Sequence, residues 1–487
     1  MGQLAEYTRV YERNPTTLLE FGDFSGGEVL SKPEDSLQPN ELSFAENVDI
    51  DPSGAALTVR DGLELVCPVS GGVSALWGWE AKSLLLFVSD GKLYKADLEN
   101  QEGVLVGTLS GTGKPVFAEW GEKGSEVLLI ASGGRLQAYN GTTLSEVTPE
   151  GLSASTVFIS NARVVIAKPN SSDTVWSAIG DHTNWTHDAN DASSAQTLPV
   201  GYKDAGEILC MVSLSKDVVV FKSSGVVYRV TGSYPSWSVS EVSRNCLVPS
   251  PFSALSLAGD VWFLDVRDGI RRLATTAAYG DIGLASEGSA VGSAVAASLT
   301  SDARIWHVKN RRQVWIQPGV SSRLYVYHYR VGGWTHYSYL NGLGIADAAC
   351  LGEASYVAAS GGIYRTGGTK DGENDYIATV RPRVTREPKP HVLVRFQVDY
   401  DLMRNGEGVA MVGEVSMPLP MASLNEDIAF LDSDEAYSDE DPLSPSAGQS
   451  VYTRQVWRSG EFKPEILVRS GRIRIRKIYL WVKGVSA

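Results

Sequence analysis

Residues 83–95, Ser-Leu-Leu-Leu-Phe-Val-Ser-Asp-Gly-Lys-Leu-Tyr-Lys, decide the fold class of this chain. An apolar run reaches the pair Asp90-Gly91, and a second run that carries an aromatic residue follows directly. Asp-Gly is a favoured two-residue hairpin turn because both residues tolerate a positive φ. The stretch therefore predicts two antiparallel strands joined by a tight turn.

The same pattern recurs further along the chain, each time with a glycine in the turn. It occurs at residues 126–139, 217–230, 260–273 and 356–365. Adjacent units are spaced by roughly 40 to 50 residues, which is the period of a propeller blade. Each pair of strands is interpreted as the inner half of a four-stranded sheet, because such sheets bury both faces when they pack radially.

These repeats predict an all-β chain with a β-propeller of six to eight blades over residues 71–370. A β-sandwich is the alternative fold. The stretch at 274–299 is rich in Ala, Gly and Ser, and it is expected to hold a small helix or a long loop between blades.

The composition supports the same fold class. The 487 residues include 49 glycines and 12 tryptophans but only 6 methionines, and the hydrophobic share of 43% is ample for a core. Glycine supplies the turns between short strands and aromatic residues fill pleated sheets, whereas helical chains use more Ala, Leu, Glu and Lys. The net charge of −14 argues against a broad nucleic-acid-binding surface, because phosphate binding depends on Lys and Arg.

The residues on either side of the propeller differ from it. Residues 1–70 predict an extended, irregular lead, in which 41–50 form a helical turn leading into a strand and 51–54 form a hairpin turn. Residues 371–487 predict a separate β-domain, because strands such as 471–481 alternate between apolar and polar positions.

This C-terminal domain suggests a subunit interface. The strand at 471–481 places isoleucines on one face and basic residues on the other, and an acidic loop at 423–442 contains no Lys or Arg. We predict that the basic face contacts this loop of a neighbouring subunit in a salt-sensitive way. The predicted interface residues are Arg472, Arg474, Arg476, Lys477, Asp434, Glu435, Asp439 and Glu440.

A phosphate-binding loop is suggested and then excluded by residues 110–114, Ser-Gly-Thr-Gly-Lys. Thr108 replaces the first glycine of that motif, and Pro115 replaces the hydroxyl residue after the lysine. The backbone cradle and the Mg²⁺ ligand are therefore both missing.

Candidate metal ligands are sparse. Asn47, Asp49 and Asp51 alternate like the ligands of a calcium loop, but Pro52 occupies the glycine position. The 6 histidines form no ligand pair, and the 4 cysteines lie far apart, as expected of free thiols made in a reducing cytosol. We predict no catalytic residues, no cofactor and no metal, and we expect neither a signal sequence nor a membrane span.

Several segments, taken in order, resemble the β-propeller structural proteins of bacteriophage tails. That family includes the tail nozzle (tail tubular protein B) and the packaged-DNA stabilisation proteins of short-tailed phages. The likeness covers about residues 20 to 340, and His182 departs from it where proline is common. Its segments are Phe24-Ser25-Gly26-Gly27, Asn47-Val48-Asp49-Ile50, Gly54, Arg60-Asp61-Gly62, 176–186, 219–229, 246–251, 261–270 and 325–334.

The resemblance implies a non-enzymatic virion protein of the tail, synthesised in the host cytoplasm and without a membrane anchor. Such a protein is a homo-oligomer, typically a hexamer, that contacts a tail adaptor and tail fibre proteins. Genomic DNA passes through its lumen without specific binding, and an acidic chain suits such a conduit. Two alternatives are a tail hub or baseplate protein that anchors fibres, and a glycan-binding or glycan-cleaving propeller with an aromatic pocket and convergent carboxylates.

Overall fold

The computed structural model describes residues 16–484, apart from 202–203, 205, 276–281, 287, 320–322, 343, 422–448 and 454–456. The chain divides into two compact units, each described by itself below. Unit 1 contains residues 1–62, 325–341 and 367–487, and unit 2 contains residues 63–324 and 342–366. Among the described residues, no helix has the length and apolar character needed to cross a membrane.

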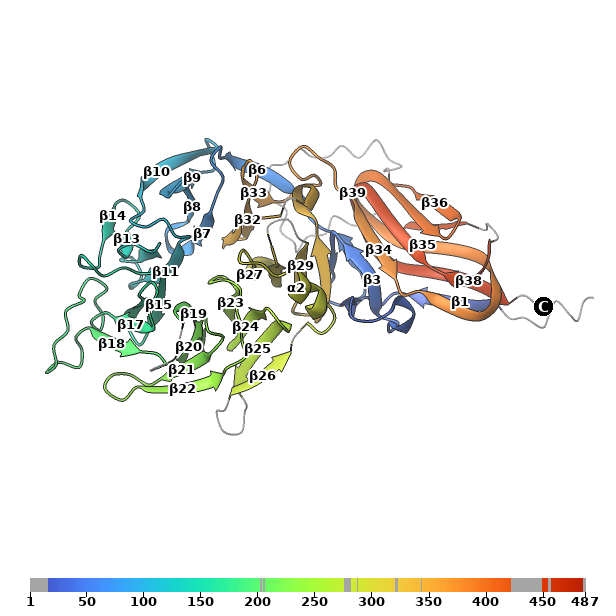
Figure 1. Cartoon of the computed structure of the whole chain (residues 1–487). Coiled ribbons are helices and arrows are strands. Elements are labelled where there is room, and N and C mark those ends of the chain that lie inside the picture. The colour runs from blue at the N-terminus through green and yellow to red at the C-terminus, as the bar shows by residue number, and fades with distance from the viewer. Residues whose placement is uncertain are drawn as a thin grey trace, which may run out of the picture. The chain divides into compact units, whose positions relative to one another are not determined.

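Unit 2 is a β-propeller, whose sheets surround a common axis (Figure 1). Five of its four-stranded sheets follow one another along the chain. They are β7–β10 (Ala75–Trp79, Leu84–Ser89, Lys92–Asp97, Glu102–Thr108), β11–β14 (Val116–Trp120, Val127–Ala131, Gln137–Tyr139, Leu144–Glu146), β15–β18 (Thr156–Ser160, Arg163–Ala167, Asp173–Trp176, Gln196–Pro199), β19–β22 (Ile208–Leu214, Asp217–Lys222, Val227–Thr231, Ser238–Ser243) and β23–β26 (Ala254–Leu257, Asp260–Asp265, Gly269–Thr275, Ile282–Ser286).

Two further sheet elements complete the ring. The hairpin of β27 (Arg304–Val308) and β28 (Gln313–Gln317) comes next, followed by β31 (Asp347–Leu351), β32 (Ala354–Ala359) and β33 (Gly362–Thr366). The first strands β11, β15, β19, β23, β27, β31 and β7 contact one another in that order. Trp77 of β7 then packs on Phe117 of β11, with 5.5 Å between the ring centroids. The described part of the chain therefore has seven inner strands, within the predicted range of six to eight blades.

The ring is closed by a strand from its own beginning. β6 (Leu63–Pro68) pairs antiparallel with β33 and forms the outer strand of the last sheet. Unit 2 also contains the short helix α2 (Gly292–Ser298) in the stretch where a small helix or loop is expected, and the 3₁₀ turns η2 (Glu80–Lys82) and η3 (Lys309–Arg311).

The hairpins predicted from the sequence are present, but they are not the inner halves of the blades. In each sheet they form the two middle strands, as β8 and β9 do in the order β10-β9-β8-β7. Middle strands are apolar on both faces because each face meets a different neighbouring blade. Leu85 and Phe87 pack toward β32, whereas Leu86 and Val88 pack toward β12. This burial produces the continuous apolar runs.

Unit 1 is built on two long strands, β35 (Thr385–Val412) and β39 (Pro464–Gly484), which pair antiparallel over most of their length. Within the unit the sheet order is β30-β2-β3-β34-β39-β35-β36, and β1 and β5 also pair with β39. The other elements are β1 (Thr16–Phe21), β2 (Gly27–Glu28), β3 (Glu41–Glu46), β4 (Val48–Ile50), β5 (Leu57–Val59), β29 (Leu324–His328, with Leu324 in unit 2), β30 (Gly333–Tyr337), β34 (Ala378–Pro382), β36 (Val415–Leu419), β37 (Gln449–Thr453), β38 (Trp457–Phe462), η1 (Glu34–Ser36) and η4 (Tyr339–Gly342, with Gly342 in unit 2).

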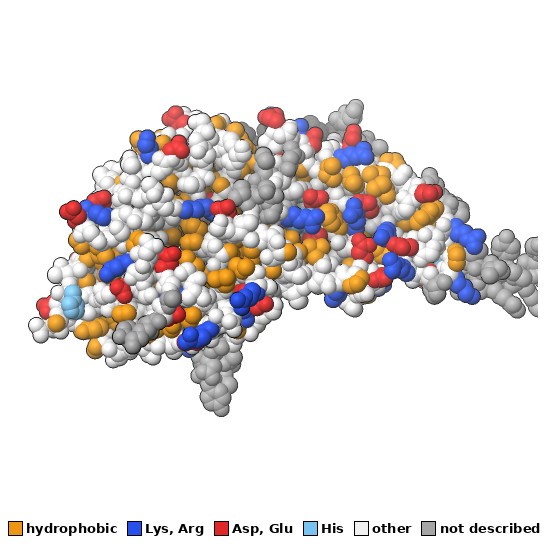
Figure 2. Space-filling view, viewed as in Figure 1, with side chains coloured by type: hydrophobic (Ala, Val, Ile, Leu, Met, Phe, Trp, Pro, Cys, Tyr) orange, Lys and Arg blue, Asp and Glu red, His pale blue; other side chains and the backbone are white. Residues whose placement is uncertain are grey.

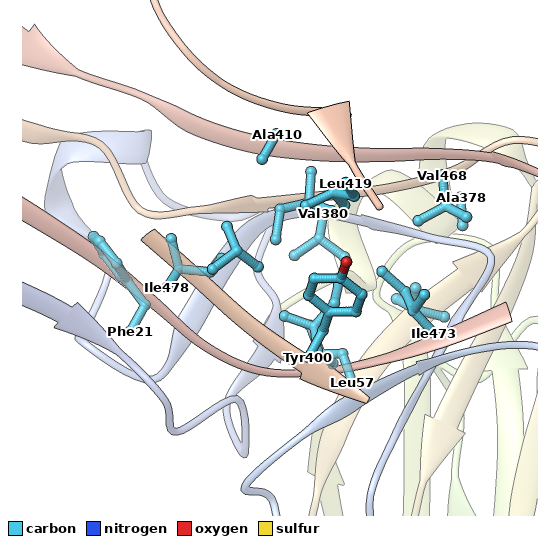
Figure 3. Packing of buried hydrophobic residues seen from close by; sticks show 14 of the residues in the cluster. Phe21, Leu57, Ala378, Val380, Tyr400, Ala410, Leu419, Val468, Ile473 and Ile478 are labelled. Atoms are coloured by element: carbon cyan, nitrogen blue, oxygen red, sulfur yellow. The ribbon is translucent and has the colours of Figure 1, made fainter. Parts of the chain in front are cut away.

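One apolar core fills unit 1 and draws on both ends of the chain. Phe21 and Leu57 come from the N-terminal part, whereas Tyr400, Ile473 and Ile478 come from β35 and β39 (Figure 3). All five are at most 4% exposed. Burial on this scale, at about 25 cal/mol per Å² of apolar surface, is the main contribution that holds the unit together.

The structure therefore joins two regions that the sequence analysis separated. Unit 1 contains both the predicted C-terminal domain, residues 371–487, and most of the predicted lead, residues 1–70. The lead belongs to unit 1 as far as Gly62, and the propeller begins at Leu63. The stretch 41–46, expected to form a helical turn, is strand β3, because β34 and β30 pair with it. The hairpin turn at 51–54 is present between β4 and β5.

Candidate functional site: the basic strand and the buried arginine of unit 1

The predicted basic strand is β39, and its two faces divide as expected. Ile473, Ile475 and Ile478 are at most 1% exposed, and the basic side chains lie on the opposite face. The alternation shifts by one position between Ile475 and Ile478, where the pairing with β35 is irregular. This bulge explains why Arg476 and Lys477 are adjacent in sequence and both partly exposed.

Each of the four predicted basic residues already has a carboxylate partner within unit 1. The pairs, with their closest N–O distances, are Arg472–Asp61 at 2.6 Å, Arg474–Asp51 at 2.8 Å, Arg476–Asp401 at 3.3 Å and Lys477–Glu20 at 2.7 Å. In the view of Figure 2, Lys and Arg side chains of this unit lie next to Asp and Glu side chains. These four cations are therefore balanced by four carboxylates of the same chain.

The predicted acidic partners cannot be placed beside this strand. Asp434, Glu435, Asp439 and Glu440 lie outside the described residues, as does the whole loop 423–442. The interface between subunits stays a prediction. For this interface to form, the acidic loop of a neighbouring subunit would have to compete with the four carboxylates that already pair with the basic residues.

A second cluster lies at the Arg-Asp-Gly segment, where Arg60 is completely buried. Arg60 Nε donates to Asn47 Oδ1 at 2.8 Å, and its two terminal nitrogens donate to both oxygens of Asp371 at 2.9 and 2.8 Å. The remaining donors reach the carbonyl oxygens of Asp61 at 2.8 Å and Ser338 at 3.4 Å. All five N–H groups of the guanidinium therefore have an acceptor.

Aromatic rings enclose the same guanidinium. Its carbon lies 3.8 Å from the ring centroid of Tyr376 and 4.1 Å from that of Tyr339. Burial opposes the charged form of Arg60, but the hydrogen bonds to Asp371 outweigh it and raise the pKa of Arg60. Burial raises the pKa of Tyr376 to about 12, and its hydroxyl donates to the carbonyl oxygen of Arg60.

The residues that alternate like a calcium loop serve other contacts. Asn47 adopts a positive φ of 58° and bonds to Arg60 and Ser338, and the Tyr337 hydroxyl donates to Asp49. Asp51 pairs with Arg474 as described above. In the part of the chain that the structure describes, no group of three or more His, Cys, Asp or Glu side chains could hold a metal ion. The four cysteines are unpaired.

Sequence reasoning identified Arg60 only through the resemblance and Asn47 through the resemblance and the calcium-like spacing, and it missed their other partners. Asp371 is 311 residues from Arg60 in the chain, and Ser338 is 278 residues away. No local pattern marks these residues. The one signal available was that Asn47 and Arg60 occur in the same resembling stretch.

Comparison with known proteins gives solved structures of low similarity. No protein-family model matches the chain, and no curated protein matches it. Similar solved structures include YCF48 bound to D1 peptide, at 11% identity over 66% of this chain and 99% of that chain, with a TM-score of 0.42. The extracellular domain of BT4673 from B. thetaiotaomicron matches at 11% identity over 79% of this chain and 57% of that chain, with a TM-score of 0.45. BBS1N in complex with ARL6DN matches at 10% identity over 63% and 95%, with a TM-score of 0.42. All three TM-scores are at most 0.45, so these matches carry no conclusion about this chain.

Proposed function

We propose that this chain is a structural protein of a bacteriophage tail, and that copies of it form the ring-shaped nozzle that retains and ejects the genome. The carrying observation is the ordered series of segments over residues 20–340 that resembles this family. Two members of the series, Asn47 and Arg60, meet in one buried cluster whose guanidinium donors all have acceptors. Residues that hold the fold together in this way are expected in a structural protein.

The charge distribution supports a conduit for DNA. A chain with a net charge of −14 repels the phosphate backbone, so a genome can slide past without adhering. Four cations of the basic strand β39 are paired with Asp61, Asp51, Asp401 and Glu20. These four cations are then less available to bind phosphate.

The conduit in this proposal lies between copies of the chain and not along the propeller axis. Lys114 and Phe252 precede inner strands β11 and β23, which are separated in the ring by β15 and β19. The Lys114 amine nevertheless lies 5.2 Å from the Phe252 ring centroid. Side chains therefore meet inside the ring, and a duplex requires the wider lumen of a homo-oligomer, proposed to be a hexamer.

Electron micrographs of the purified full chain, alone and mixed with tail fractions, test this function. Sixfold rings with a channel wide enough for duplex DNA, stacked below the adaptor, are the expected result. Docking of single copies to the side of the tail would instead favour a hub that anchors fibres. A chain that does not bind to tails but does bind saccharides would refute a role in the tail. That result would favour the glycan-binding alternative.

A further inference from the structure

Two cationic side chains meet at one aromatic ring inside the propeller. Arg304 is the first residue of β27, and its guanidinium carbon lies 4.9 Å from the ring centroid of Phe252. The Lys114 amine lies 5.2 Å from the same centroid. Asp347, the first residue of β31, completes the group, with 3.2 Å between its Oδ1 and Arg304 Nη1. All four residues lie at or just before the start of inner strands, and we call this group the axial mouth.

Lys114 is held in place by the glycine-rich stretch 110–114 that does not fit a phosphate-binding loop. Gly111 N donates to Ser132 Oγ at 3.1 Å, and Gly113 N donates to Ser132 O at 2.8 Å. A Cβ at Gly111 would approach Ser132 O to 2.1 Å, so only glycine allows this contact. The loop therefore fixes the start of the Lys114 side chain, which reduces the entropy lost on binding.

Arg304 lacks a full set of partners. It is only 4% exposed, and among the described residues its Nη2 atom has no hydrogen-bond acceptor. Asp347 offers little more, because its oxygens already accept Leu76 N at 2.9 Å, Ala348 N at 3.0 Å and Trp306 Nε1 at 2.7 Å. A buried guanidinium donor without an acceptor is costly and usually marks a missing water or ion.

The charge balance of the axial mouth favours an anion. Within the described part of the chain Lys114 has no carboxylate partner, so two cations share the single carboxylate of Asp347. Burial lowers the pKa of Arg304 and raises the pKa of Asp347, which shows that this pair is poorly compensated. A net charge of one suits a monovalent anion, and Asp347 disfavours a dianion such as phosphate.

We propose that the axial mouth binds a carboxylate between Arg304 Nη2 and Lys114 Nζ. Phe252 is half-buried in the turn before β23, and its ring now packs on the guanidinium. The ring moves aside when the carboxylate enters, because Nη2 is covered in the unliganded chain. The carboxylate belongs to a free organic acid or to an acidic residue of a partner protein. This site does not depend on the proposed tail function.

Titration calorimetry on the full chain tests the proposal with propionate, a short acidic peptide and inorganic phosphate as probes. We expect binding of propionate or the peptide and weaker binding of phosphate. Lys114→Met should weaken carboxylate binding about tenfold, since it removes one charge-assisted hydrogen bond. Phe252→Leu should tighten it, because the smaller side chain uncovers Arg304. Preference for the peptide over propionate would identify a protein partner, and the reverse a free acid.

Lys123→Met is the matched control, because Lys123 is exposed in the loop before β12 and outside the axial mouth. It should bind the carboxylate as the unmodified chain does. The proposal is overturned if neither carboxylate binds, if phosphate binds at least as tightly, or if Lys123→Met and Lys114→Met have the same effect. Opposite signs for Lys114→Met and Phe252→Leu cannot arise from a general loss of stability.

Discussion

Arg60 joins three distant segments of unit 1 through Asn47, Ser338 and Asp371, so we expect its replacement to be costly. Arg60→Lys keeps the charge but cannot bond both oxygens of Asp371 and reach the other acceptors as well. Breaking a buried ion pair costs about 3–5 kcal/mol, and we expect a loss near the lower end. Hydrogen exchange of β3 and β34 should report this loss as faster opening of unit 1.

An exposed arginine provides the matched control. Arg365 pairs with Glu64 at 3.2 Å, but the two side chains are 52% and 47% exposed. Arg365→Lys should change the free energy of unfolding by less than about 1 kcal/mol. Equal losses for the two substitutions would show that the Arg60 network contributes no more than a surface pair.

The buried hydroxyl of Tyr376 leads us to expect a loss of stability at alkaline pH. Burial raises the pKa of its hydroxyl from 10.0 to about 12. Between pH 10 and pH 12 the unfolded chain releases this proton while the folded chain keeps it, so stability falls as the pH rises. The slope contributed is about 1.4 kcal/mol per pH unit. Urea unfolding across this range should show a shallower dependence in Tyr376→Phe, and an unchanged dependence would assign the alkaline loss to other groups.

At the scale of elements, closure of the propeller depends on the contact of β6 with β33. Gly362 has a φ of 147°, and a Cβ there would lie 2.2 Å from the carbonyl oxygen of Cys67 on β6. Gly362→Ala should therefore push β6 away from the last sheet. We expect faster hydrogen exchange in both strands and a lower melting temperature.

The control for this substitution is Gly259→Ala. Gly259 also has a positive φ, at 89°, but a Cβ there would meet nothing within 4 Å. It should show only the backbone strain, of order 1–3 kcal/mol, and leave exchange in β6 unchanged. If Gly259→Ala exposes β6 to the same extent, strain and not closure explains the effect.

The sequence predicted those strands whose burial leaves a simple pattern. β8 is apolar on both faces from Leu84 to Val88, so this run is recognisable beside its Asp-Gly turn. The inner strand β7, Ala-Leu-Trp-Gly-Trp, has no such run, and the middle strands were therefore mistaken for inner ones. The contacts of β3 were equally hidden, because its partner β34 lies more than 300 residues later in the chain.

At the scale of the whole molecule, the open question is whether the basic face acts within one chain or between chains. Replacing Arg472, Arg474, Arg476 and Lys477 by glutamine should weaken ring assembly and remove its dependence on salt. Mass photometry at low and high ionic strength measures both effects.

The intrachain partners supply the comparison variant. Asp61, Asp51, Asp401 and Glu20, replaced by their amides, lose the same four ion pairs but leave the basic residues in place. If rings form in this carboxylate variant but not in the glutamine variant of the basic residues, the basic residues contact a neighbouring subunit. Equal failure of both variants would assign them to the cohesion of unit 1 and remove the predicted interface.

The division of the chain into units has a consequence for synthesis on the ribosome. Every strand of the propeller, including its closing strand β6, lies before residue 367, whereas β1 and β5 pair with β39 near the end of the chain. The propeller can therefore close while the rest is still being translated. β1 and β5 are synthesised before the propeller and β39 after it, so both strands stay without this partner until β39 has left the ribosome.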